Sequence, residues 1–340
     1  MSQTPRHSTE RAVPTSADVA RLAGVSRATV SYVLNNTASV RISEPTRHRV
    51  RAAAEELGYV PHAAARSLRA GHTRMVLLPT ATHPVGPLHH QFFGELQWAL
   101  RRLDYTVVQY GSLGLDGDEA ARAWAELRPV AVVSLGEVGL TAYGVEVLKR
   151  SGAKAVISLA PRRVEGARCL VMDQREVGDC AVSHLVRRGR QAIGVVMPVE
   201  RGLELFAEPR YEGARRAAER AGARAVPLPL SYDEDAAADL AARWPQLGLD
   251  AVYTYNDDYA MLLMRALQDR GVSIPDDTAV IGADDLLLGR LLRPRLSTVH
   301  IDMTTGRHMA ELVDRAVRDP DRVPERHDLM RVRAVQRDST

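Results

Sequence analysis

Most of the chain alternates short apolar runs with longer amphipathic stretches. From residue 74 onward the apolar runs are rich in β-branched residues and read MVLLPT, TVVQYG, VAVVSLG, AVISLA, CLVMD, AIGVVMP, DAVYTYN, AVIGADD, STVHID and, last, RVRAV. Segments with helical spacing separate them, among them FFGELQWALRRLD, EVGDCAVSHLVRRG, YEGARRAAERAG and YAMLLMRALQDRG. This alternation predicts an α/β body of parallel sheets covered by helices on both faces. Residues 74–340 are enough for two such sheets.

The first 60 residues follow a different, purely helical pattern. Thr15 or Ser16 is placed to cap a first helix, and Gly24 to end it in the left-handed conformation. Ser26 is placed to cap a second helix, and a third is expected from near Ser43 to Leu57. The short turn between the first two helices predicts a helix-turn-helix, in which the second helix enters the major groove of DNA.

The start of that second helix carries residues suited to DNA. Arg27 can bind guanine through two hydrogen bonds, and Ala28 or the Thr29 methyl group can contact a thymine methyl. Tyr32 shares the expected outer face. Phosphate or capping hydrogen bonds suit the remaining polar side chains: Ser26, Thr29, Ser31 and Asn35. The alternative is a small three-helix bundle whose polar face is simply solvated.

Charge and composition support the first interpretation. The chain has 45 basic and 42 acidic residues, but residues 1–72 hold ten arginines against five acids. A basic head on a near-neutral body is typical of a protein that meets a polyanion. No apolar run approaches the roughly 20 residues of a membrane helix, and the N-terminus lacks the apolar core of a signal peptide. We therefore expect a cytoplasmic protein without a membrane partner, with Cys169 and Cys180 as free thiols.

Polar residues follow several strands of the body. Asp173, Asn256 and Asp284 each come at a strand end, and Arg210 follows AIGVVMP in an expected helix. Ligands of open parallel sheets bind beyond the carboxyl ends of the strands, although these side chains could equally cap the helices that follow. Gly-rich phosphate loops are missing, and histidines 83, 89 and 90 lack the partners of a metal site. We expect neither cofactor nor metal, and with three Phe and three Trp no aromatic stacking platform.

The head resembles a known family. DVARLAGVSRATVSYVLN and ISEPTRHRVRAAAEELGYVPHAAARSLRAG are similar to the DNA-binding head of the LacI/GalR family of bacterial transcription regulators. The resemblance implies a flexible tail at 1–14, a helix-turn-helix domain at 15–60 and a hinge helix with linker at 61–73. It implies that Leu68 inserts into the minor groove as a wedge and that Ala65 lies against the groove floor. His62 replaces the asparagine common in the family.

The body resembles the effector domain of the same family. RYEGARRAAERAG, YTYNDDYAMLLMRALQDRGVSIPDDTAVIGADD and RPRLSTVHID are similar to its two-lobed fold, which is like that of periplasmic binding proteins. The implied lobes are about 74–174 with 301–320, and about 175–300 with 321–340. The resemblance implies a small effector, often a sugar, between the lobes. The implied contacts are His83, Asp173, Arg210, Asn256 and Asp284, and Thr82, a polar residue after the first strand, is a further candidate.

Together these features predict a transcription regulator, expected to be a repressor, whose DNA binding responds to a small molecule. Because the final strand is followed by no leucine-heptad helix, we expect a homodimer that reads a palindromic operator. Two alternatives are a solute-binding protein that shares the body fold and an enzyme acting on a sugar or nucleotide. The acid pairs Asp257/Asp258 and Asp284/Asp285 are the residues an enzyme would use.

Overall fold

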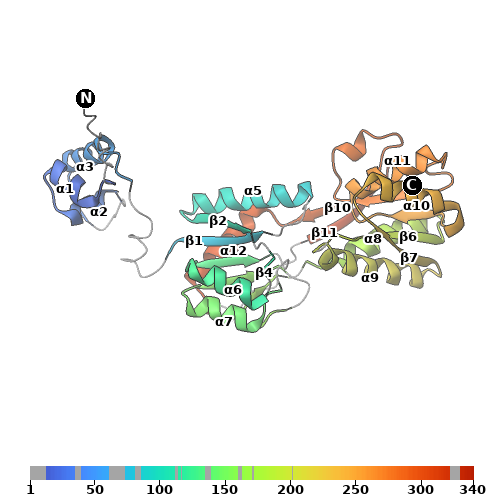
Figure 1. Ribbon diagram of the computed structural model, residues 1–340, viewed down its shortest axis with the longest axis horizontal. Coiled ribbons are helices and arrows are strands. Elements are labelled where there is room, and N and C mark those ends of the chain that lie inside the picture. Colours follow the sequence, from blue (N-terminus) through green and yellow to red (C-terminus); the bar gives the residue numbers. More distant parts are fainter. Residues whose placement is uncertain are drawn as a thin grey trace, which may run out of the picture. The chain divides into compact units, whose positions relative to one another are not determined.

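The computed structural model describes residues 13–34, 40–60, 73–80, 86–111, 114–115, 117–134, 139–159, 163–170, 172–200, 202–321 and 330–340. The chain forms two compact units, Met1–Thr73 and Arg74–Thr340 (Figure 1). Several predicted features lie outside the described residues, namely most of the tail, the hinge segment up to residue 72, and the candidate residues Asn35, His62, Ala65, Leu68, Thr82 and His83.

The first unit is the predicted set of three helices: α1 (Ser16–Ala23), α2 (Arg27–Leu34) and α3 (Glu44–Glu56). Thr15 caps α1 in a reciprocal arrangement with Asp18, and Gly24 ends it with φ 64°, as the sequence predicts. The helices enclose a small core of alanine and valine side chains: Val19, Ala20, Ala23, Val30, Val33, Val50, Ala53 and Ala54. The short turn and this core confirm the predicted helical head.

The second unit contains two sheets, and the first has the strand order β2-β1-β3-β4-β5, all parallel. Its strands are β1 (Met75–Thr80), β2 (Thr106–Gly111), β3 (Ala131–Ser134), β4 (Ala155–Ser158) and β5 (Arg168–Cys169). Side chains alternate between its two faces, so that Val76 and Leu78 pack under α5 (Pro87–Arg102) and α12 (Gly306–Arg318). Leu77 points the other way, under α6 (Gly117–Glu126) and α7 (Ala142–Arg150). Figure 1 shows these two helices on the opposite face of the sheet from α5.

The second sheet has the order β11-β10-β9-β8-β6-β7. Its strands are β6 (Ala192–Pro198), β7 (Arg224–Leu230), β8 (Ala251–Tyr253), β9 (Ala279–Ala283), β10 (Ser297–Met303) and β11 (Met330–Val335). One face is covered by α8 (Arg175–Arg187) and α9 (Glu204–Arg220), the other by α10 (Glu234–Leu247) and α11 (Asp257–Asp269) (Figure 1). The predicted α/β body with helix-covered parallel sheets is confirmed.

Three details differ from the sequence-based expectation. The edge strand β7 is absent from the predicted strands. Pro227 and Pro229 are tolerated in it because β7 lies at the edge of the sheet and pairs only with β6. The final strand β11 runs antiparallel to β10. Strand β10 stays in the second sheet up to Met303. The chain therefore crosses back to the helices of the first sheet after Met303, slightly later than the expected boundary near residue 301.

Helices α8 and α9 cross at unusually close range. A Cβ on Gly178 of α8 would overlap the carbonyl oxygen of Arg210 and lie 2.7 Å from its carbonyl carbon. A Cβ on Gly213 of α9 would similarly lie 2.7 Å from the carbonyl carbon of Arg175. The two helix backbones can therefore touch only because both positions lack a side chain. This contact fixes the height of Arg210 above the sheet.

Among the helices of the described ranges, none is both long and apolar enough to cross a membrane.

Candidate functional site

Helix α2 presents the polar face that the sequence assigned to DNA. Arg27, Ala28 and Tyr32 are exposed, whereas Val30 and Val33 are buried against the other two helices. Ser26 is also exposed and accepts a hydrogen bond from the backbone N–H of Thr29 at 3.1 Å, so it caps the helix as predicted. Thr29 and Ser31 are half-buried at the rim of this face. The contact of these side chains with DNA stays a prediction.

The second unit has a cavity of about 240 Å³ at the carboxyl ends of the strands of its second sheet. One side of its wall comes from the start of α5, with Gly86, Pro87 and Leu88, and the crossover segment adds Met303 and Thr304. The charged and amide side chains of the wall are Gln174, Glu200, Arg210, Asn256, Asp258 and Asp284. Three of the predicted effector residues are therefore brought together, although they are far apart in the sequence.

Arg210 is buried and held by three contacts with two residues. Its Nε donates to Oε1 of Gln174 at 2.9 Å, and one terminal nitrogen donates to the backbone carbonyl of Tyr255 at 2.7 Å. Its guanidinium also lies over the Tyr255 ring, 4.8 Å from the centroid. Nearby Tyr253, Tyr255 and Asp284 raise the pKa of Arg210 against the opposing effect of burial. The cavity thus has a fixed positive charge in its wall.

Asn256 both caps a helix and lines the cavity, the two roles that the sequence allowed. Its Oδ1 accepts from the backbone N–H of Tyr259 at 3.1 Å and so caps α11. Its side chain also lines the cavity together with Asp284, where it opposes the rise in the pKa of the Asp284 carboxyl. A Cβ on Gly86 would lie 3.6 Å from Asn256 Nδ2 and 3.8 Å from Asp284 Oδ2, so the start of α5 approaches this pair closely.

Asp284 reaches the cavity through a strained turn. Asp284 and Asp285 have φ values of 94° and 53°, in a region that costs a residue with a side chain about 1–3 kcal/mol. The turn is fixed because Asp284 N–H donates to the Val299 carbonyl at 2.9 Å and Leu286 N–H donates to Asp257 at 2.7 Å. Burial raises the pKa of Asp284, while Arg210 opposes the rise. Such strain is found where a site needs a set geometry.

The neighbouring acids point away from the cavity. Asp285 pairs with Arg337, and His300 Nδ1 lies 3.1 Å from its carboxylate; burial opposes ionisation, but these partners lower the pKa of Asp285. Asp257 is fully buried and accepts from the Thr298 hydroxyl at 2.6 Å. Each predicted acid pair therefore divides between one residue in the cavity wall and one structural residue.

Asp257 gives the second unit a pH-dependent stability. Burial raises its pKa to about 7 from an ordinary value of 3.8. Because the folded state then binds the proton more tightly, the stability from this group is complete below about 3.8 and is lost as the pH rises to about 7. We expect the difference in Tm between wild type and Asp257→Asn to change by several degrees over this window and to be flat above it. Parallel curves would contradict this, and Asp269→Asn, on the exposed end of the same helix, is the control.

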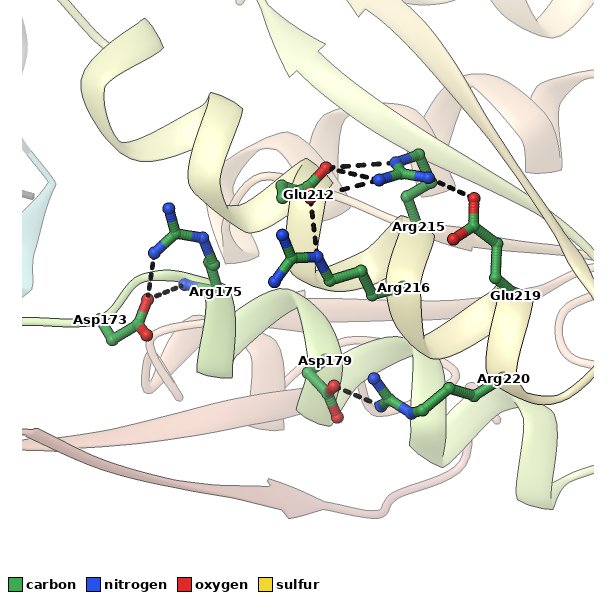
Figure 2. Close-up of polar contacts among 8 residues, drawn as sticks. All are labelled: Asp173, Arg175, Asp179, Glu212, Arg215, Arg216, Glu219 and Arg220. Carbon is green, nitrogen blue, oxygen red and sulfur yellow. Dashed lines mark hydrogen bonds and ion pairs between the residues drawn. The ribbon is translucent and has the colours of Figure 1, made fainter.

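Asp173 is not part of the cavity wall. Its carboxylate accepts from the backbone N–H of Arg175 at 3.1 Å and pairs with the Arg175 side chain at 3.4 Å, at the start of α8 (Figure 2). The adjacent residue, Gln174, lines the cavity instead and is buried. The Asp173 carboxylate therefore accepts a hydrogen bond from a backbone N–H in the first turn of α8, which is the simpler of the two interpretations of this residue.

The expectation of no aromatic platform is wrong. The cavity wall contains five aromatic side chains: Phe92, Phe206, Tyr232, Tyr255 and Tyr259. The Tyr259 ring lies 5.2 Å from that of Tyr232 and 5.9 Å from that of Tyr255, centroid to centroid. A count of Phe and Trp alone misses the tyrosines of YTYNDDY, whose position after a predicted strand is the signal in the sequence.

The remaining candidates take ordinary places. Trp244 is buried on α10 and donates to the Thr278 hydroxyl at 2.9 Å, whereas Trp98 is exposed on α5 beside Arg102. Of the three histidines after the first strand, His90 has a described side chain, and it is exposed. Within the described part of the chain, no three His, Cys, Asp or Glu residues gather into a group that could hold a metal ion.

Comparison with known proteins places both units. The family model for "Bacterial regulatory proteins, lacI family" matches residues 15–62, and that for "Periplasmic binding protein-like domain" matches residues 182–340. The chain is 31% identical over 333 residues to the HTH-type transcriptional regulator GalR of Escherichia coli (strain K12), covering 95% of this chain and 94% of that protein. It is 30% identical over 315 residues to the HTH-type transcriptional repressor PurR of Vibrio atlanticus (strain LGP32), covering 89% and 92%.

The fold has a solved counterpart. The Lac repressor dimer bound to operator and the anti-inducer ONPF matches with a TM-score of 0.77 and 21% identity, over 96% of this chain and 99% of that one. This likeness shows the shared fold, and the identity to GalR over nearly the whole length shows the family. The chain belongs to the LacI family of bacterial regulatory proteins and is a DNA-binding transcriptional regulator.

Proposed function

We propose that this regulator is a repressor whose affinity for operator DNA is controlled by a small polar metabolite in the cavity of its second unit. The observation that carries the proposal is the convergence of Arg210, Asn256 and Asp284 from three separate elements onto one cavity. Guanidinium, carboxamide and carboxylate groups can each hold paired hydroxyl groups, so a polyhydroxylated ligand suits this set.

The position of the cavity supports control by ligand. Its wall includes Gly86, Pro87, Leu88 and Phe92, from the start of α5 over the first sheet. Arg210 and Asn256 come from the helices of the second sheet, and Met303 and Thr304 from the crossover. A ligand that contacts both lobes favours the lobe arrangement in which all contacts are made. If operator DNA favours one of these arrangements, the two affinities are coupled.

We infer that the protein binds its ligand rather than transforms it. In each acid pair one member is committed to the fold, since Asp257 holds the turn after β9 and Asp285 pairs with Arg337. Asp258 and Asp284, which line the cavity, lack a nucleophile-and-base arrangement with any described neighbour. Turnover of a cavity ligand would contradict this inference.

We also propose a cytoplasmic homodimer that reads a palindromic site. The short helix η1 (Leu288–Arg290) and its flanks expose three large leucines: Leu287 (69%), Leu288 (57%) and Leu291 (64%). Contiguous exposed leucines are unusual on a monomer and are typical of an interface. The relative solved with operator is a dimer, and a two-fold dimer presents two heads to two half-sites.

The proposal is tested by mapping the genomic sites that the protein occupies and then screening metabolites that change this occupancy. We expect a palindromic site bound well above random duplex at moderate salt, and at least one metabolite that shifts the binding. Absence of any preference for a promoter sequence over random duplex, with and without metabolites, would overturn the proposal.

Arg27→Ala is expected to cost about 1–3 kcal/mol at one base position of the operator and to relax the preference there. The reason is that an exposed arginine at the start of α2 can bind one guanine through two hydrogen bonds. Binding to operators substituted one base pair at a time measures the effect. Arg265→Ala, on the exposed surface of α11, is the control. A uniform loss over all sequences would identify Arg27 as a phosphate contact instead.

A further inference from the structure

The cavity wall carries more negative than positive charge. Among its described residues, the carboxylates are those of Glu200, Asp258 and Asp284, and the one cation is Arg210. Arg210 and Asp284 line the same cavity, and Arg210 offsets one of the three negative charges. Two carboxylates remain without an opposite charge in this part of the wall.

Glu200 is satisfied by neutral partners. It accepts a hydrogen bond from the Tyr259 hydroxyl and another from the backbone N–H of Tyr232, the latter at 2.6 Å. These bonds join the carboxylate to two of the three cavity tyrosines. Glu200 thereby fixes the tyrosines in place and adds negative potential behind their rings.

Asp258 has no such partners. Its carboxylate is half-buried in the wall, and within the described ranges it makes no hydrogen bond or ion pair. Its negative charge acts on nearby groups and contributes to raising the pKa of both Tyr232 and Asp284. A ligand that covers Asp258 removes its remaining water, and this costs free energy unless the ligand brings an opposite charge or strong donors.

The tyrosines next to Asp258 favour a charged donor over a neutral one. Tyr232, Tyr255 and Tyr259 form a continuous aromatic wall, and one face of Tyr255 already holds the guanidinium of Arg210. Ring faces attract cations, and the attraction strengthens when water is excluded. A neutral hydroxyl could bond Asp258 but would leave two wall carboxylates uncompensated.

Building on the proposed function, we propose that the effector is a hydroxylated amine, an organic cation of the amino-sugar class. Its ammonium group lies between the Asp258 carboxylate and the tyrosine wall. Its hydroxyl groups bind Arg210, Asn256 and Asp284. The cavity thereby selects for a positive charge at one end of the ligand and for hydroxyl groups at the other.

The test uses the full chain and two pairs of probes that differ in charge: D-glucosamine against D-glucose, and benzylammonium against benzyl alcohol. Calorimetry at neutral pH is expected to show each cation binding at least about tenfold more tightly than its neutral counterpart. Asp258→Asn keeps the shape of the side chain and is expected to abolish this preference. Asp269→Asn removes a charge from the exposed end of the same helix and is expected to leave the preference unchanged.

Three results would overturn the ligand class: equal or tighter binding of the neutral probes, no binding of either cation at millimolar concentration, or a cation preference that survives in Asp258→Asn. Operator binding is measured on the same samples to separate the two proposals. If a neutral or anionic metabolite shifts operator binding and amines do not, the amine class is rejected and the proposed regulatory function stands. Failure to bind any operator rejects the proposed function, while calorimetry still decides the ligand class.

Discussion

Replacing Gly178 with alanine is expected to lower the free energy of unfolding of the second unit by about 3 kcal/mol. The added Cβ would overlap the backbone carbonyl of Arg210, and backbone cannot move aside as a flexible side chain can. Helix α9 must shift away from α8, which opens the core beneath both helices. Because the overlap is at Arg210 itself, the same shift displaces this side chain from Gln174 and Tyr255 and is expected to weaken any response to ligand.

Urea unfolding of the full chain, followed by far-ultraviolet circular dichroism, measures this effect. The matched control is Gly94→Ala on α5, where a Cβ would meet nothing within 4 Å. Alanine is the better helix former, so this variant is expected to gain up to about 1 kcal/mol. Equal stabilities for the two variants would show that α8 and α9 do not depend on their close approach.

The ion pairs on the surface around this helix crossing contribute less to stability than the close contact at the glycines. Asp179 on α8 pairs with Arg220 on α9, and Glu212, Arg215, Arg216 and Glu219 form a network along α9 (Figure 2). These side chains are largely exposed, and exposed ion pairs contribute about 0–1 kcal/mol each. The glycine contact, rather than the visible network of charges, therefore determines how the two helices are held.

The helical head was predictable because its signals are local. The capping box at Thr15, the left-handed Gly24 and the cap at Ser26 each depend on neighbours within a few residues. The strands with uninterrupted β-branched runs were predictable for the same reason. Strand β7 was not, since its two prolines are tolerated only because tertiary structure places it at a sheet edge.

The candidate site was predictable only in part. Position at strand ends, together with the family resemblance, selected Arg210, Asn256 and Asp284, which the fold does bring together. Asp173 was expected in the site, but its neighbour Gln174 lines the cavity instead, and this difference of one residue at the start of α8 is not fixed by any local pattern. The tyrosine wall is made by residues from a loop and a helix that meet only in the folded chain.

Arg210→Met is expected to destabilise the second unit by about 3–5 kcal/mol, because two oxygens that accept from this buried guanidinium lose their donor and the nearby Asp284 loses a compensating charge. Methionine keeps the length of the side chain but removes the positive charge that acts on the half-buried Asp284 carboxylate, and leaves the Gln174 and Tyr255 oxygens without their donor. The pKa of Asp284, already raised by burial, rises further without Arg210. Stability from a group with a raised pKa is lost as the pH rises, so the deficit of the variant is expected to be smaller in mild acid than at neutral pH.

The double variant Arg210→Met/Asp284→Asn separates charge from packing. If Arg210 stabilises the unit mainly by compensating Asp284, removing the carboxylate as well is expected to restore about half of the lost stability and to flatten its dependence on pH. No recovery would mean that the hydrogen bonds to Gln174 and Tyr255 carry the effect. In either case the ligand response is expected to be lost, while the separately folded head retains its non-specific affinity for DNA, because that affinity depends on the basic residues of the head. Such a result would locate metabolite sensing and DNA binding in different units of one chain.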